Sequence, residues 1–293
     1  MSASPTVLVT GAGGHLGRVV VETLLAAKPG KVVAASRDPA RLAGLAARGA
    51  ETRRADFDDP ASLDAAFKGV DRLLIISTDD VVTPGKRLRQ HTAAVEAAAR
   101  VQVGHVVYTS MPNPEPGSPI PFAPDHYGTE LALAKSGLAH TILRVSWYAE
   151  NLARSLPGVL ASGKWFTSAG EGRVANVARD DVARAAAAAL VKAPGGTFDV
   201  TGPDLLTTRE IAATAAAVFA RQIEVVPVSD EQLFAGMVAA GVPEPFARLG
   251  VAFEANTRAG RVAIVSDAVE ALTGRRPIRL ADAIAALKPA LAA

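Results

Sequence analysis

The stretch VLVTGAGGHLG, from Val7 to Gly17, decides the fold of this chain. It begins with a short apolar run, as expected of a buried β-strand, and continues into three glycines at every third position, Gly11, Gly14 and Gly17. Apolar residues at helical spacing follow. A strand, a tight glycine turn and a helix start form the arrangement that binds the pyrophosphate of a dinucleotide. The sequence therefore predicts a nucleotide-binding β-α unit at this point.

Each glycine has its own physical reason in this arrangement. Gly11 lets the chain turn sharply, Gly14 lets the backbone approach a phosphate, and Gly17 lets the helix pack closely on the strand. The helix N-terminus then presents unpaired amides to the anion. We expect the cofactor to contact the following residues of the segment: Thr10, Gly11, Gly13, Gly14, His15, Leu16 and Gly17.

The end of the second apolar run, VVAASRD, indicates which dinucleotide binds. NAD-binding units carry an acidic residue there that accepts hydrogen bonds from the ribose, whereas this chain has Ser36 and Arg37. Because a guanidinium pairs bidentately with a 2'-phosphate, the sequence favours NADP(H). Asp38 is the rival ribose ligand, but Pro39 follows it, so we expect Asp38 to cap a helix. The alternative for Arg37 is an ordinary surface arginine.

The composition is that of a globular protein with a substantial core. Of the 293 residues, 49% are hydrophobic and 20% charged, and the absence of cysteine excludes disulfides and cysteine nucleophiles. The net charge is only +2 with scattered arginines, which argues against a nucleic-acid partner. No apolar run approaches the roughly 18 residues of a membrane span, and no signal peptide is visible, so we expect a cytoplasmic protein. The histidines lack metal-ligand spacing, so no metal is expected.

Apolar runs alternate with Ala-rich helical stretches through the first half of the chain. This alternation is typical of a doubly wound parallel sheet with helices on both faces, an α/β fold of the Rossmann type, which we expect over residues 1–150. Strands are predicted at Val7–Val9, Lys31–Ala35, Glu51–Arg54, Leu73–Ile76, His105–Tyr108 and Thr141–Arg144. Crossover helices are predicted at Leu42–Arg48, Ser62–Phe67, Lys86–Arg100 and Thr129–Ser136.

Beyond Trp147 the pattern becomes mixed. It predicts a smaller mixed α/β substrate-binding subdomain over residues 151–293, partly interlaced with the first domain. Within it, TFDVT is a short strand-like run, and two pairs have the spacing of helix capping boxes: Thr207 with Glu210, and Ser229 with Gln232.

The loop from Met111 to Pro124 is too rich in proline for regular structure. It follows the fifth predicted strand at its carboxyl end, where open α/β sheets bind ligands. The loop is therefore a candidate wall of the substrate pocket, and the alternative is a rigid surface excursion.

Polar or aromatic residues follow the third, fourth and fifth predicted strands. Those after the third strand are placed to flank the adenine, although the aromatic one fits the core equally well. The hydroxyls after the fourth and fifth strands would lie beside the nicotinamide half or a substrate carbonyl, and each alone has the alternative of capping a turn. The residues are Asp56 and Phe57, then Ser77 and Thr78, then Thr109 and Ser110.

The chain resembles the atypical short-chain dehydrogenases, in particular the NmrA-like branch that includes quinone oxidoreductases of type 2 and triphenylmethane reductases. The resemblance covers nearly the whole chain and is narrowest at HxxTE, from His126 to Glu130, and at ILRxxWYxEN, from Ile142 to Asn151. It implies NADP(H) as cofactor and extends the predicted contacts to Tyr108, Arg144, Val145 and Ser146. Quinone reductases of this branch generally carry Asn where Val145 stands, which leaves the acceptor open.

The usual catalytic pair of short-chain dehydrogenases, YxxxK, is missing. Aligned on Glu130, the tyrosine and lysine places are taken by Phe122 and His126. A general acid built from a tyrosine beside a lysine is therefore not expected. Since alcohol dehydrogenation and sugar epimerisation depend on that tyrosine, the sequence argues against both activities.

The remaining chemistry is hydride delivery to an acceptor that needs little help with its proton. A quinone and a cationic triarylmethane dye both fit, and catalysis would rest on near-attack positioning. Ser110, His126 and Tyr148 are the candidates for orienting the acceptor or donating a proton. The alternatives are that His126 caps the helix start and that Tyr148, like Trp147, is a core aromatic.

Two functions from different classes follow. The first is an NADPH-dependent reductase of a quinone or related small-molecule acceptor, present as a monomer or homodimer. The second, also drawn from the NmrA-like resemblance, is a redox sensor that binds NADP without turnover. WYAEN and GVPEPF in this chain favour the enzyme.

Overall fold

A single parallel sheet forms the centre of the molecule. The structure is a computed structural model, and it describes residues 4–291. Seven strands lie in the order β3-β2-β1-β4-β5-β6-β9, and every neighbouring pair is parallel. Their bounds are β1 Thr6–Val9, β2 Lys31–Ser36, β3 Glu51–Arg54, β4 Arg72–Ile75, β5 His105–Ser110, β6 His140–Val145 and β9 Gly196–Val200.

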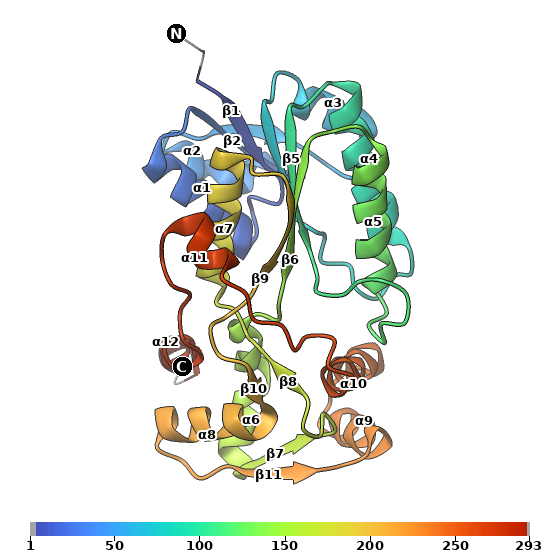
Figure 1. Ribbon diagram of the computed structural model, residues 1–293, viewed down its shortest axis with the longest axis vertical. Coiled ribbons are helices and arrows are strands. Elements are labelled where there is room, and N and C mark those ends of the chain that lie inside the picture. The colour runs from blue at the N-terminus through green and yellow to red at the C-terminus, as the bar shows by residue number, and fades with distance from the viewer. Residues whose placement is uncertain (1–3, 292–293) are drawn as a thin grey trace.

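Helices cover both faces of this sheet (Figure 1). On one face lie α1 His15–Ala27, α7 Arg179–Lys192 and α11 Ala268–Thr273; on the other lie α3 Pro60–Phe67, α4 Lys86–Arg100 and α5 Ala123–Lys135. A separate apolar core fills the space on each side. The predicted doubly wound α/β fold is confirmed.

A smaller mixed part lies beyond the carboxyl ends of β6 and β9 (Figure 1). Its strands pair as β7 with β11, in parallel, and β8 with β10, antiparallel. The bounds here are η2 Ala149–Arg154, α6 Leu156–Ser162, β7 Lys164–Thr167, β8 Arg173–Val174, β10 Leu206–Thr207, α8 Thr208–Phe219, β11 Glu224–Pro227, α9 Asp230–Ala239, α10 Glu244–Arg258, α12 Leu280–Ala286 and α13 Lys288–Leu291. Both predicted capping boxes form, at the starts of α8 and α9.

The predicted elements of the first half differ from the observed ones mainly at helix starts. Each of the six strands ends within two residues of its prediction, and α4 matches to the residue. Helix α5, however, begins at Ala123 rather than Thr129, because Pro124 occupies its first turn, where a missing N–H costs nothing. The predicted helix Leu42–Arg48 is instead a short 3₁₀ turn, η1 Pro39–Leu42, followed by one turn of α2, Ala43–Ala46.

The predicted boundary near residue 150 stays a prediction. The TFDVT run forms β9, which pairs with β6 and completes the sheet, and α7 packs against α1. Residues after the boundary therefore contribute to the sheet and to its cover.

The glycine turn has the tight geometry that its sequence predicts. Gly11 has φ of +63°, in the left-handed region that a residue with a side chain rarely adopts. At Gly17 an added Cβ would lie 2.3 Å from the carbonyl oxygen of Gly11, which is an impossible contact. Helix α1 can therefore approach the turn this closely only because Gly17 has no side chain.

A buried polar network joins α4 and α5 to β5. The backbone N–H of Thr78 donates to Nε2 of His91, at 3.0 Å, so the proton of His91 lies on Nδ1 and faces Thr129 Oγ1, also at 3.0 Å. On α5, Nδ1 of His126 lies 2.8 Å from the hydroxyl of Tyr108. The Arg87 guanidinium donates to Nε2 of His126 at 2.9 Å, so that nitrogen carries no proton.

Both histidines of this network are neutral. Burial, with a further contribution from the positive charge of Arg87, lowers the pKa of His91 to about 3. The same two causes hold the pKa of His126 well below its ordinary value of 6.5. Each ring can therefore accept one hydrogen bond and donate another, and the network fixes α4 and α5 on the sheet.

We predict that Gly17→Ala destabilises the protein by about 1 to 3 kcal/mol, because the new methyl group forces α1 away from the glycine turn. The measurement is the free energy of unfolding in urea. Gly44→Ala is the matched control, since nothing lies within 4 Å of its added Cβ, and it should not destabilise. Equal losses in the two variants would show that the close approach at Gly17 does not limit packing.

We predict that His91 makes the protein less stable as the pH falls below about 6.5. Between about pH 6.5 and pH 3, His91 is protonated in the unfolded chain but neutral in the folded protein, because its pKa in the folded protein is about 3. The free energy of unfolding therefore falls by about 1.4 kcal/mol for each pH unit in this range. Urea unfolding between pH 7.5 and pH 5 should give a shallower pH dependence for His91→Gln than for the unchanged protein. The exposed His15→Gln controls for the substitution itself, and an unchanged slope for His91→Gln would contradict the prediction.

Candidate functional site

The strand ends that carry the predicted site residues meet at one edge of the sheet. Thr10 Oγ1 donates to the carbonyl oxygen of Leu74 at 2.9 Å and accepts from the N–H of Ile76 at 3.1 Å, which fixes the end of β1 against β4. Thr109 Oγ1 accepts from the N–H of Ser77 at 2.9 Å and joins β4 to β5 in the same way. Thr10 and Thr109 are almost fully buried, so their hydroxyls hold the edge together beneath the site.

The glycine turn leaves an anion site open at this edge. Gly14 caps α1 without any side-chain hydrogen bond, so the first amides of the helix have no partner in the described part of the chain. Gly14 and His15 are exposed, and a Cβ added to Gly14 would meet only the carbonyl oxygen of Gly11, at 3.4 Å. The backbone here fits a dinucleotide pyrophosphate, held by the amides and the helix dipole. Gly13, Leu16 and Gly17 support the same turn.

The end of β2 has the polarity that a 2'-phosphate requires. Asp38 Oδ1 accepts from the N–H of Ala40 at 3.0 Å, so the predicted capping role of Asp38 is confirmed and its carboxylate is engaged with η1. Arg37 is exposed, and no carboxylate in residues 4–291 forms an ion pair with it. Ser36 Oγ lies 3.4 Å from the place of a Cβ on Gly13, next to the glycine turn.

Asp56 and Phe57, the residues predicted to flank the adenine, follow β3. Asp56 Oδ1 accepts from the N–H of Asp58 at 3.1 Å, and Phe57 is half-buried against the core beneath α3 and α4. Phe57 thus has a core contact as well as an exposed part. Their predicted contacts with adenine stay predictions.

A chain of charges runs from Ser110 to the proline-rich loop. Ser110 Oγ donates to Glu130 Oε1 at 2.6 Å, and Arg144 donates to Glu130 Oε2 and to Glu115 Oε1, both at 2.7 Å. Although burial opposes the charge of Arg144, the two carboxylates raise its pKa above the ordinary value. The hydroxyl proton of Ser110 is therefore engaged with a carboxylate, and Arg144 is paired with both Glu130 and Glu115. Its role in this structure is to position the strand end.

Two of the predicted contact residues lie beneath the sheet edge. Tyr108 is fully buried and His126 is 3% exposed, and both belong to the network around His91. Both nitrogens of His126 and the hydroxyl of Tyr108 are already engaged in this network, so neither side chain has a free hydrogen-bonding atom for cofactor or acceptor. The physical reason is the alternation along β5, which turns Tyr108 toward α4 and α5.

The start of the ILRxxWYxEN segment carries two buried polar atoms without partners. Ser146 Oγ and Trp147 Nε1 find no hydrogen-bond partner among the described residues, whereas Val145 is an ordinary core side chain. An orphaned hydroxyl beside the strand ends fits a bound polar group, such as the nicotinamide amide. Tyr148 is half-buried with the Arg179 guanidinium 5.2 Å from its ring, and burial raises its pKa to about 12.

An aromatic cluster near the same edge could not be found from local sequence patterns. Phe122, at the start of α5, lies 6.2 Å from the ring of Phe253 on α10, and Phe253 lies 4.8 Å from Trp147. Met111 and Ile120 complete the apolar surroundings. Phe253 comes from far along the chain, and its helix gives no sign of this contact.

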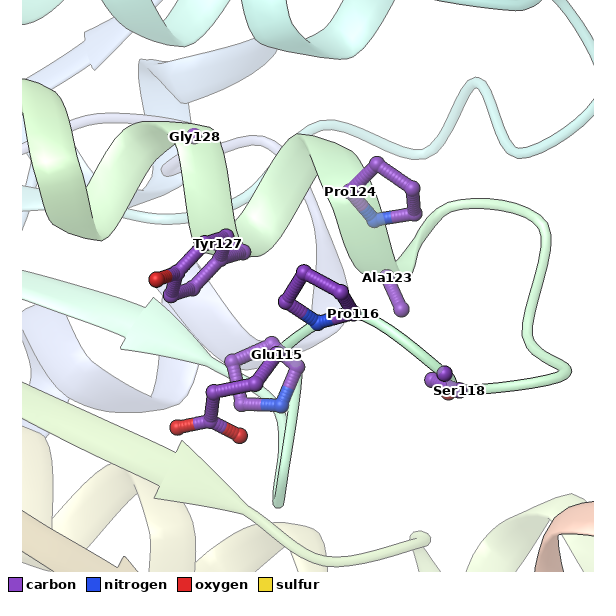
Figure 2. A pocket seen from close by; sticks show the side chains of 9 residues that line it. Glu115, Pro116, Ser118, Ala123, Pro124, Tyr127 and Gly128 are labelled. Atoms are coloured by element: carbon purple, nitrogen blue, oxygen red, sulfur yellow. The ribbon is translucent and has the colours of Figure 1, made fainter.

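The proline-rich loop also lines a cavity of about 360 Å³, which is large enough for a small molecule. Figure 2 shows Pro116 and Glu115 of the loop facing Tyr127 and Pro124 of α5 across it. Its lining residues do not include the glycine turn or any predicted cofactor contact. The loop is thus a wall of a cavity, and whether that cavity takes the substrate stays a prediction.

Two features are absent from the described residues. No helix within residues 4–291 has both the length and the apolar character of a membrane span. No group of three metal-ligating side chains gathers anywhere in the same residues.

Comparison with known proteins gives consistent matches along the chain. A family model described as NAD(P)H-binding matches residues 11–193. Quinone oxidoreductase 2 of Escherichia coli (strain K12) is 33% identical over 284 residues, which cover 96% of this chain and 98% of that protein. A crystal structure of an NADPH-dependent quinone oxidoreductase from Escherichia coli, complexed with NADPH, has a TM-score of 0.90 at 32% identity and covers 96% of this chain and 99% of that one.

A second solved structure is similar to the same extent. The triphenylmethane reductase of Citrobacter sp., complexed with NADP(H), has a TM-score of 0.87 at 33% identity, covering 95% of this chain and 98% of that one. An NmrA structure at 17% identity has a TM-score of 0.77, which shows a shared fold. Since the family model spans more than half of the chain and the likeness extends over nearly all of it, the chain belongs to the NAD(P)H-binding family and has the NmrA-like fold of its oxidoreductases.

Proposed function

We propose that this protein is an NADPH-dependent oxidoreductase that delivers hydride to a quinone or a related conjugated acceptor. The observation that carries the proposal is the open glycine turn next to the end of β2, where Arg37 has no ion-pair partner within residues 4–291 and the Asp38 carboxylate caps η1. The full-length likeness to a quinone oxidoreductase and a triphenylmethane reductase supports the same acceptor class. A cytoplasmic location and a monomeric or homodimeric state stay predictions.

Different residues of the site bind different parts of the dinucleotide. Backbone amides at the start of α1 hold the pyrophosphate, and the Arg37 guanidinium pairs with the 2'-phosphate. Ser146 Oγ supplies a hydrogen bond to the nicotinamide half. When bound, NADPH supplies the hydride; the protein positions the acceptor against it and excludes water.

Three polar side chains near the proposed acceptor site are unsuited to donate a proton to it. His126 is buried and neutral, Tyr108 is fully buried, and the proton of Ser110 is engaged with Glu130. We therefore assign His126 and Tyr108 to positioning rather than to proton transfer. Tyr148 remains the candidate for orienting the acceptor. Such a site suits an acceptor whose reduced form is stable as an anion and can take its proton later from water. A quinone is such an acceptor, because it is reduced to a hydroquinone anion.

The direct test is oxidation of NADPH by the purified protein with benzoquinones, naphthoquinones and a triarylmethane dye, with NADH as the comparison cofactor. Loss of nicotinamide absorbance with at least one acceptor is expected. Tight binding of NADPH without turnover of any acceptor would instead support the alternative, a redox sensor, and would overturn the enzyme proposal.

We predict that Arg37→Ala weakens NADPH binding by about 10- to 100-fold and leaves NADH binding nearly unchanged, because a charge-assisted pair with the 2'-phosphate is worth about 1.5 to 3 kcal/mol. Dissociation constants measured by nicotinamide fluorescence for both cofactors give the result. Arg41→Ala, a second exposed arginine in the following turn, is the matched control. Equal weakening of NADPH and NADH would contradict the assignment.

A further inference from the structure

Arg87, in the first turn of α4, is a buried cation that forms no ion pair within residues 4–291. Its side chain is 3% exposed, and its one hydrogen bond among the described residues runs to Nε2 of His126, at 2.9 Å. The Nε of Arg87 is buried and has no partner in the same part of the chain. Burial lowers the pKa of Arg87, yet a guanidinium stays protonated in a protein. A full positive charge is therefore held in the interior.

The surrounding acids do not neutralise this charge. Asp80 is bonded to Lys86 and to the N–H of Thr83. Asp79 and Asp125 contribute only a field, since neither forms an ion pair with Arg87 in the described residues. Arg144, by contrast, is paired with two carboxylates. Because an uncompensated buried charge costs several kcal/mol, its presence indicates a use for an anion at this place.

The guanidinium lies next to the aromatic cluster. Its central carbon is 4.8 Å from the centre of the Phe122 ring, and Phe122 lies against Phe253. When the chain is aligned on Glu130, Phe122 and His126 occupy the positions of the tyrosine and lysine of the YxxxK motif. Helix α4, which lies beside α5 in Figure 1, thus brings a positive charge to the region that has lost the lysine of the usual pair.

We propose that Arg87 stabilises the oxyanion that forms when a quinone accepts hydride. The inference rests on the proposed function. Hydride adds two electrons and one hydrogen to the quinone and gives the hydroquinone monoanion, which then takes one proton from water. The guanidinium lowers the energy of that negative oxygen in a low-dielectric place and transfers no proton itself. Neutral His126 keeps Arg87 in place by accepting its hydrogen bond.

A cationic triarylmethane dye separates this role from a structural one. The dye becomes neutral on accepting hydride, so no oxyanion forms and Arg87 has nothing to stabilise. We predict that Arg87→Met lowers kcat/KM for a benzoquinone by about 100-fold, the size expected for loss of one oxyanion donor, and leaves kcat/KM for the dye unchanged or raised. Arg87→Lys, which keeps the charge, should recover part of the quinone activity.

Arg89→Met is the matched control, since it removes an exposed arginine from the same turn of α4. It should leave both acceptors unaffected. Equal losses for quinone and dye in Arg87→Met would overturn the oxyanion role and leave the proposed function standing. Failure of the unchanged protein to reduce either acceptor would overturn the proposed function, and the role of Arg87 with it.

A binding measurement tests the same charge without turnover. The probe is para-nitrophenol, whose absorbance reports its ionisation, and it is added to the protein saturated with NADP⁺. Displacement of the phenol by a quinone shows that both bind at the same site. The unchanged protein should shift the bound phenol toward its anion, and Arg87→Met should not. An unshifted spectrum with the unchanged protein would overturn the inference even if the methionine variant does not fold.

Discussion

The closeness of α1 to the turn that follows β1 is the constraint on which the rest of the structure depends. No side chain at Gly17 fits between the helix and the carbonyl oxygen of Gly11. This contact points the first amides of α1 at the sheet edge, where β2, β4 and β5 also end. The hydroxyls of Thr10 and Thr109 then hold those ends together from below, so the binding edge is a rigid consequence of backbone packing.

Two arginines that bond to α5 have opposite electrostatic surroundings. Arg144 is paired with Glu115 and Glu130, which neutralise its charge. These ion pairs hold the end of β6 and the side chain of Ser110 in place. Arg87 has no carboxylate partner in the described part of the chain, where it contacts a neutral imidazole and an aromatic ring. The protein itself neutralises the charge of Arg144, whereas the positive charge of Arg87 is left to attract an anionic ligand.

Local signals in the sequence were sufficient for most of the fold. Apolar runs and glycine spacing predicted six strands whose ends lie within two residues of the observed ones, and residue pairs three apart predicted both capping boxes. The sequence places the start of α5 at Thr129 instead of Ala123 because prolines usually break helices, whereas Pro124 costs no hydrogen bond in the first turn. Arg87 with His126, and Phe122 with Phe253, were not predictable, since each contact joins different elements. Tyr108 and His126 were selected by motif, and only the packing showed their burial.

The origin of β9 and α7 has a consequence for the order in which the chain can fold. The strand that completes the sheet and the helix that covers α1 both come after residue 178, well past the segments predicted to contact the cofactor. During synthesis the apolar surface of α1 and β6 stays uncovered until this later stretch leaves the ribosome. A shortened chain that keeps every predicted cofactor contact would thus expose part of its core to solvent and to aggregation.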